Sequence, residues 1–260
     1  MAVYVALGSS FASGPGIESI IDARCGRSAN NYAHLVAERL GYDLVDVTCG
    51  GATVDNLLDV PQALMTGGTV PPQLESLRPD ADLVTITVGG NDVEYMLTLG
   101  RCSYRVAPDA APPGAGEFFG TPATPDAVDA ALAALPGKLA ALVSAVRNRA
   151  PRARVLLIDY LTVLPRSGGC AALPMTEEDL RSCVDLGRRL EEATAEAARA
   201  SGAELVEASA ISRDHTVCDP EPWVTGWEFG DVLAGGVGPY HPNAAGMRAV
   251  ADAVVGRLTR

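Results

Sequence analysis

The sequence predicts an α/β fold, a three-layer α/β/α sandwich around a mainly parallel sheet, in one domain that covers residues 1–260. Two observations support this prediction. Short apolar runs rich in β-branched residues alternate with longer segments of helical period along the whole chain. No internal repeat and no linker-like composition divides the chain. Strands that alternate with helices form parallel sheets with helices on both faces.

Five apolar runs are predicted to be buried strands, because they are short and β-branched and most end in glycine or polar residues. They are residues 3–7 (VYVAL), 43–48 (DLVDVT), 81–88 (ADLVTITV), 153–160 (ARVLLIDY) and 203–208 (AELVEA). A Pro/Gly-rich stretch, residues 107–125, is predicted to be irregular.

Helices are predicted between these strands from apolar periodicity and end signals. Residues 29–41 end at a glycine, and the alanine-rich segment 126–149 is expected to break at Pro136. The sequence TEEDL resembles a capping box that opens a helix over residues 176–200. A last helix is expected to start at Pro242, since proline is tolerated in the first helical turn.

Composition and charge exclude several classes of protein. Hydrophobic residues make up 48% of the 260 residues, enough for a sizeable core. The net charge of −12 repels phosphate backbones and anionic lipids, so a nucleic-acid partner is not expected. No uninterrupted apolar run approaches the roughly 20 residues of a membrane span, so no stable membrane insertion is expected. Composition leaves the oligomeric state unknown.

Six dispersed cysteines bear on where the protein works. They are Cys25, Cys49, Cys102, Cys170, Cys183 and Cys218. They show no CxxC or CxxH spacing, so no metal site is predicted. An even number of scattered cysteines is typical of a disulfide-bonded extracellular domain, and six buried thiols are the alternative. A strand begins directly after Met1, so either a leader peptide has been removed or the protein is cytoplasmic.

Three glycine-containing corners follow predicted strands: GSS at 8–10, GGAT at 50–53 and GGND at 89–92. Ligands of open parallel sheets bind beyond the carboxyl ends of the strands, where these corners must meet. A serine there needs a base to become a nucleophile, and the chain has only three histidines, His34, His215 and His241. Ordinary turns, caps and structural histidines are the alternative interpretation of each feature.

The order GSS, GGAT, GGND and then YHPN resembles the SGNH, or GDSL-type, hydrolase family, over nearly the whole chain. The stretches YVALGSSFASG, CGGAT and CDPEPWV are most similar to its actinobacterial extracellular esterases and lipases. The resemblance implies the flavodoxin-like fold of that family and no cofactor. It also implies that Ser10 is the nucleophile and His241 the general base, with an oxyanion hole formed by Ser10 N–H, Gly51 N–H and the Asn91 side chain.

The chain departs from the family pattern at two positions. Ser9 replaces the usual aspartate before the nucleophile, and Gly238 stands where an acid commonly precedes the histidine. Some actinobacterial members orient the histidine with a backbone carbonyl, which implies that Gly238 C=O does so here. The family's three disulfides imply Cys25–Cys49 and Cys170–Cys218, and leave Cys102–Cys183 by elimination.

The predicted function is therefore hydrolysis of carboxylic esters, small or lipid, by an extracellular serine hydrolase with a Ser-His dyad. An acyltransferase or thioesterase using the same dyad, and a non-catalytic ligand-binding relative, are the alternatives. Five loop aromatics are candidates for an acyl groove or, equally, for loop anchors. They are Phe118, Phe119, Trp223, Trp227 and Phe229.

Overall fold

Five parallel strands form the centre of the computed structural model, which describes residues 2–230, 236 and 238–259. Their order across the sheet is β4-β1-β7-β8-β9, and every neighbouring pair is parallel. The strands are β1 (Val3–Gly8), β4 (Asp43–Asp46), β7 (Leu83–Thr87), β8 (Arg154–Ile158) and β9 (Glu204–Val206). The predicted strands and fold class are confirmed.

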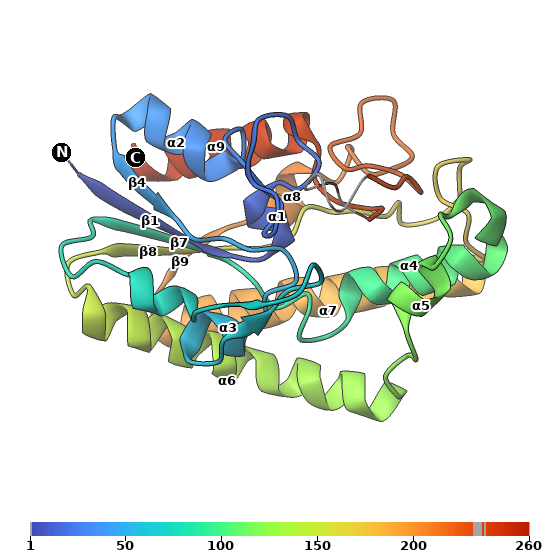
Figure 1. The fold of residues 1–260 in the computed structure, drawn as a ribbon, viewed down its shortest axis with the longest axis horizontal. Coiled ribbons are helices and arrows are strands. Elements are labelled where there is room, and N and C mark those ends of the chain that lie inside the picture. The colour runs from blue at the N-terminus through green and yellow to red at the C-terminus, as the bar shows by residue number, and fades with distance from the viewer. Residues whose placement is uncertain (1, 231–235, 237, 260) are drawn as a thin grey trace.

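Helices cover both faces of this sheet (Figure 1). On one face lie α2 (Tyr32–Leu40) and α9 (Ala244–Leu258), and on the other lie α3 (Val54–Leu58), α6 (Pro125–Arg149) and α7 (Glu177–Ser201). Every residue of β1 and β7 is buried. Strands buried on both faces are typically near-continuous apolar runs, as VYVAL shows. In LVTIT the hydroxyls of the two buried threonines, Thr85 and Thr87, are hydrogen-bonded to those of Tyr4 and Tyr32.

Helix α6 corrects the expectation of a break at Pro136. Pro136 lies inside it without ending it. Buried leucines and valines at helical spacing on both sides of the proline, including Leu132, Leu139 and Val146, pack against the core and outweigh the one lost N–H bond. By length and mean hydropathy this helix could also cross a membrane, although it packs on α7 and β8 here.

Two further helices differ from the sequence prediction. Helix α9 begins at Ala244, not Pro242, because the Asn243 side chain caps it by accepting the N–H groups of Ala245 and Gly246. Helix α4 (Tyr95–Val106) directly follows the GGND corner and was not predicted.

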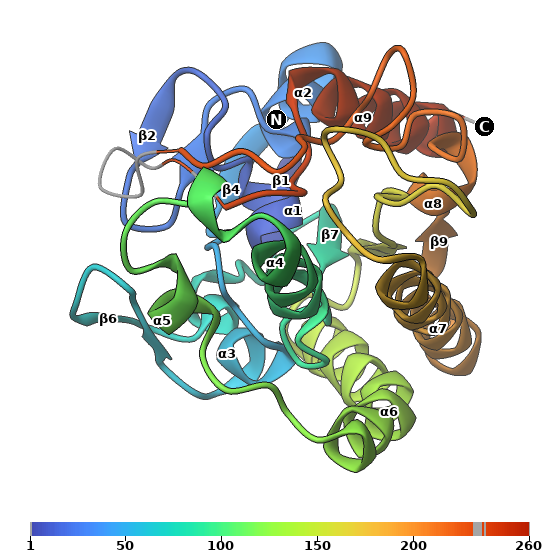
Figure 2. The same cartoon turned by 90° about the vertical axis from the view of Figure 1, so that its right-hand side faces the viewer.

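Short elements surround the carboxyl ends of the strands, the end of the molecule that faces the viewer in Figure 2. They are α1 (Ser10–Ser13), the hairpins β2 (Ile20–Asp22)–β3 (Arg27–Ser28) and β5 (Gln62–Ala63)–β6 (Thr69–Val70), the 3-10 turns η1 (Gln73–Ser76) and η2 (Pro108–Ala110), α5 (Ala115–Phe119) and α8 (Ala208–Ile211). The stretch predicted to be irregular thus contains one short helix and a 3-10 turn.

Two disulfides tie loops at this end of the sheet, Cys25–Cys49 and Cys170–Cys218. The third pairing left by elimination is corrected. Cys102 on α4 and Cys183 on α7 are buried free thiols whose Sγ atoms lie 3.8 Å apart, well beyond the roughly 2.05 Å of a disulfide bond.

Candidate active site

Ser10 is the first residue of α1 and directly follows a tight turn at the end of β1. The backbone of Gly8 has a φ of +154°, and a Cβ there would lie 2.6 Å from the Thr87 carbonyl oxygen, so only glycine fits. The Ser9 N–H donates to that same carbonyl oxygen at 2.9 Å. The turn therefore brings Ser10 to the carboxyl end of the sheet beside β7.

A buried amide braces this turn from η1. The Gly8 N–H donates to Gln73 Oε1 at 2.8 Å, and Gln73 Nε2 donates to the Gly8 carbonyl at 2.9 Å. These two bonds hold Gly8, the last residue of β1, on the side of η1. No local pattern in the sequence marks Gln73 for this role.

His241 is held by a loop paired to the segment before it. Thr225 N–H donates to the His241 carbonyl at 2.8 Å, and His241 N–H donates to Thr225 Oγ1 at 3.2 Å. The preceding Tyr240 has a φ of +68°, is fully buried, and hydrogen-bonds Ser103 of α4 through its hydroxyl. Contacts on both sides of His241 therefore fix the direction of its ring.

The structure places His241 Nε2 2.9 Å from Ser10 Oγ. On the other side of the ring, Nδ1 lies 3.1 Å from the Gly238 carbonyl oxygen and 3.0 Å from that of Pro239. A carbonyl only accepts hydrogen bonds, so Nδ1 carries the proton and Nε2 is left to accept from Ser10. Among the described residues, no carboxylate hydrogen-bonds to His241. The Pro239 carbonyl was missed from sequence.

Burial lowers the pKa of His241 from its ordinary value of 6.5 to about 4, although the hydrogen bonds to the Pro239 and Gly238 carbonyls act in the opposite direction. Burial penalises the imidazolium because it removes the charge from water. Without a carboxylate to compensate, the ring is neutral at pH 7. A neutral ring is the form that can accept a proton.

Three hydrogen-bond donors face the same space as Ser10. Within the described residues, neither Ser10 N–H nor Gly51 N–H donates to a recorded acceptor. Asn91 Nδ2 donates to the Ala52 carbonyl at 2.8 Å, which leaves its second N–H. Asp92 Oδ2 accepts the Val54 N–H at 3.0 Å, so the GGND corner holds the GGAT corner in place.

Ser9 occupies a different environment from Ser10. Its hydroxyl lies 3.4 Å from the hydroxyl of Tyr160, which also accepts the Gly90 N–H at 2.8 Å. Ser9 is 1% exposed. Ser9 therefore packs inward under the site, whereas Ser10 contacts His241.

A pocket of about 490 Å³ contains Ser10, Gly51, Asn91, Gly238 and His241. Its remaining walls are largely apolar and come from the β5–β6 hairpin, α4 and α5; they include Leu64, Met65, Met96, Leu97, Phe118, Phe119 and Phe229. Three of the five candidate aromatics thus line the pocket.

The other two aromatics are not in the pocket wall. Trp227 is 9% exposed and stacks on Phe119 from outside the lining. Trp223 stacks on His215 with ring centres 3.9 Å apart, and His215 Nδ1 lies 2.8 Å from the Glu221 carbonyl oxygen. His34, in the N-terminal part of the chain, has its Nδ1 3.4 Å from Asp46 Oδ2. Neither His34 nor His215 lines the pocket.

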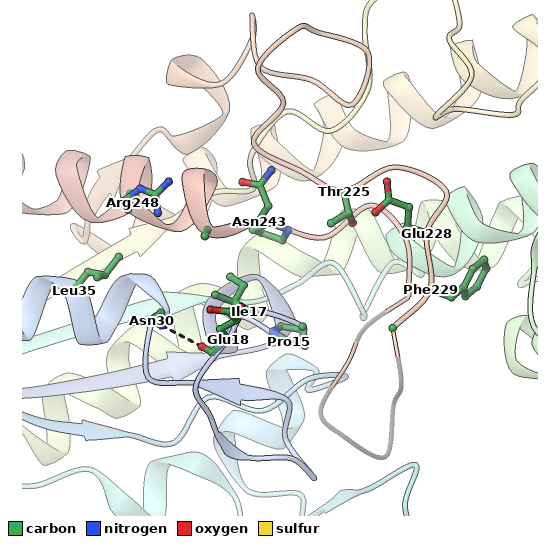
Figure 3. Close-up of a pocket in the computed structure, with 14 residues that line it drawn as sticks. Pro15, Ile17, Glu18, Asn30, Leu35, Thr225, Glu228, Phe229, Asn243 and Arg248 are labelled. Carbon is green, nitrogen blue, oxygen red and sulfur yellow. Dashed lines mark hydrogen bonds between the residues drawn. The ribbon is translucent and has the colours of Figure 1, made fainter.

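A larger hollow of about 630 Å³ lies between α2, α9 and residues 225–230 (Figure 3). Its charged lining residues are Glu18, Glu228 and Arg248, all exposed. It contains neither Ser10 nor His241, although it shares Phe229 with the smaller pocket. Size therefore does not identify the reactive site in this molecule. In the described part of the chain, no cluster of three or more His, Cys, Asp or Glu side chains is placed to hold a metal.

Comparisons with known proteins show the family of this chain. Residues 6–249 match the model of the GDSL-like Lipase/Acylhydrolase family. Lipase 2 of Streptomyces coelicolor is 33% identical over 260 residues, covering 96% of this chain and 83% of that protein.

Solved structures show the same fold. Phospholipase A1 from Streptomyces albidoflavus superposes with a TM-score of 0.76 at 24% identity, covering 98% of both chains. An extracellular lipase from Streptomyces rimosus gives a TM-score of 0.72 at 25% identity, covering 98% of this chain and 99% of that one.

Fold and relatives together define a carboxylic ester hydrolase. The chain belongs to the GDSL-like lipase/acylhydrolase family.

Proposed function

We propose that the chain is an extracellular serine hydrolase that cleaves carboxylic esters with an apolar acyl chain through a Ser10–His241 dyad. The observation that carries this proposal is the 2.9 Å contact between Ser10 Oγ and a neutral, buried His241 whose Nδ1 is satisfied by two carbonyls. The apolar walls of the pocket support the acyl part. The two disulfides, and the extracellular relative from Streptomyces rimosus, support secretion.

The first half of the reaction acylates the serine. Ser10 Oγ attacks the ester carbonyl carbon while its proton passes to His241 Nε2. The carbonyl oxygen becomes an oxyanion, which accepts hydrogen bonds from Ser10 N–H, Gly51 N–H and Asn91 Nδ2. The intermediate collapses when His241 gives its proton to the leaving alcohol. A water molecule, deprotonated by His241, then attacks the acyl carbon, the bond from that carbon to Ser10 Oγ breaks, and Oγ takes the proton back from His241 as the carboxylic acid leaves.

The Gly238 and Pro239 carbonyls replace the usual acid in this scheme. They fix the tautomer and orientation of His241, as a carboxylate would. They stabilise the imidazolium less than a full negative charge does, because a carbonyl is only a dipole. The imidazolium is therefore an intermediate of the reaction and not the resting form.

Paired serine variants test the proposal. Ser10→Ala should abolish hydrolysis of p-nitrophenyl butanoate and covalent labelling by a fluorophosphonate probe, because no other hydroxyl lies against His241 Nε2 in the described chain. Ser9→Ala is the matched control and should keep labelling, since Ser9 faces Tyr160. Reversed results would show that Ser9 is the nucleophile. If both variants were still labelled, the dyad would be refuted.

A further inference from the structure

Phe119 is the centre of an aromatic cluster along one wall of the catalytic pocket. Its ring centre lies 5.9 Å from those of Tyr104 and Trp227, and 6.5 Å from that of Phe229. Phe118 contacts it edge-on at 5.4 Å. Phe119 is 4% exposed whereas Phe118 is 48% exposed. The two neighbours therefore differ, Phe119 being a fixed part of the wall and Phe118 lying at the surface.

The Phe119 ring occupies a notch in α4 made by Gly100. A Cβ at position 100 would lie 2.2 Å from Phe119 Cε1 and 2.8 Å from Cδ1, far closer than atoms can approach. Glycine is unfavourable inside a helix, and here its missing side chain is what admits the ring. The wall is therefore seated directly on the backbone of α4.

The backbone around Phe119 is also tied to α4. Arg101 Nη1 donates to the Phe119 carbonyl at 2.9 Å, and the same guanidinium pairs with Glu94. Glu94 Oε2 in turn accepts the Ala123 N–H at 3.2 Å. Arg101 of α4 and Glu94, the residue before α4, thus hold the backbone of Phe119 and of the residues that follow it, which limits the freedom of the ring to swing aside.

We propose that Phe119 closes the acyl end of the pocket and sets the longest acyl chain that the enzyme accepts. This inference rests on the proposed function. An acyl chain that extends from Ser10 along Met96 and Leu97 meets a ring that is clamped in the Gly100 notch. Removing the ring opens the notch, and each further methylene buried there strengthens transition-state binding about fourfold.

Chain-length selectivity of Phe119→Ala tests the inference. The measured quantity is kcat/KM for p-nitrophenyl dodecanoate divided by kcat/KM for p-nitrophenyl butanoate. We expect this ratio to rise roughly tenfold or more, the effect of a few methylenes in an apolar pocket. The ratio cancels any general loss of activity caused by disturbing Trp227 and, through it, Tyr240 beside His241. Leu142→Ala, a buried truncation on α6 away from the pocket, should leave the ratio unchanged.

A second variant moves the wall in the opposite direction. In Gly100→Ala the new methyl group displaces the Phe119 ring towards the pocket, so the ratio should fall below that of the wild type. Phe119→Leu gives a milder enlargement should the alanine variant fold poorly. An unchanged ratio in a folded Phe119→Ala or Phe119→Leu protein would overturn the inference.

A binding measurement separates this inference from the proposed function. In the Ser10→Ala background, calorimetric titration with dodecanoate should show tighter binding when Phe119 is also alanine. A wild-type protein that hydrolyses no ester would refute the proposed function. The dodecanoate affinities would then still decide whether Phe119 limits the pocket, equal affinities refuting it.

Discussion

The lowered pKa of His241 determines how activity should depend on pH. Only the neutral ring can take the Ser10 proton, so kcat/KM follows the neutral fraction in the free enzyme. An ordinary histidine loses that fraction as the pH falls through 6.5. Because burial lowers the pKa to about 4, we expect kcat/KM to stay level through pH 6.5 and to fall only as the pH approaches about 4.

Initial rates of p-nitrophenyl butanoate hydrolysis between pH 4 and 8 would measure this profile. Circular dichroism at each pH separates titration from unfolding. A fall in activity centred near pH 6.5 would contradict the lowered pKa, because it would mean that burial does not disfavour the imidazolium of His241.

Removing single carboxylates tests whether His241 works without an acid partner. Asp214, Asp219 and Glu228 are described acids in the segment that precedes His241 in sequence, and Asp219 already accepts bonds from Thr216. Asp231, in the same segment, lies outside the described residues. We expect each Asp→Asn or Glu→Gln variant to lower kcat less than about tenfold, whereas loss of the acid from a true triad costs about 10⁴. His241→Ala is the inactive reference. A folded amide variant that lost a thousandfold would reveal a hidden acid.

At the scale of elements, η1 shows how a segment remote in sequence supports the nucleophile. Gln73→Ala leaves the Gly8 N–H without an acceptor in a buried turn, whereas the Gly8 carbonyl keeps the Cys49 N–H at 3.0 Å. We expect a loss of about 1–3 kcal/mol in the free energy of unfolding and a lower kcat, since the Ser10 turn loosens. Glu75→Ala, an exposed change on the same turn, is the control and should alter neither. Equal Tm values for the two variants would contradict the bracing role.

The elements that sequence predicted are those whose local pattern agrees with their packing. The buried strand that starts at Val3 is a continuous apolar run, VYVAL, before its final glycine, and Gly41 and Gly202 mark helix ends because both adopt left-handed backbone there. Helix α4 was missed because its interior Gly100 reads as a helix breaker, and only the Phe119 ring explains it. The continuity of α6 through Pro136 likewise depends on tertiary contacts.

The residues of the candidate site also fall into two groups, those that sequence motifs indicated and those that only the fold reveals. Ser10, Gly51, Asn91 and His241 lie in motifs whose order along the chain indicated one pocket, and the structure brings them together. Their roles stay predictions. Gln73 and Tyr160 reach the serine turn from 65 and 151 residues away in sequence. No local pattern encodes such distances, so these supporting residues could not be found without the fold.

At the scale of the whole molecule, one of the two disulfides links a glycine corner of the candidate site to a surface loop. Cys25–Cys49 fixes the turn between β2 and β3 to the residue before Gly50, and the Gly50 N–H donates to the Cys25 carbonyl at 2.9 Å. Gly51, the proposed oxyanion donor, follows directly. Closing loops of 24 and 48 residues stabilises the fold by roughly 3–4 kcal/mol each in the chain-entropy model. Reduction should therefore lower both Tm and kcat.

Thiol titration provides the matching count. Four of the six cysteines are bonded, and Cys102 and Cys183 are free and buried. We therefore expect almost no reaction of the native protein with Ellman's reagent, because neither thiol is accessible, and two thiols per chain in denaturant without reductant. Cys102→Ala should lower that count to one. A count of zero thiols in the denatured wild type would show that Cys102 and Cys183 are joined by a disulfide in the isolated protein. A count of six would show that neither disulfide is present, which would remove the argument for secretion.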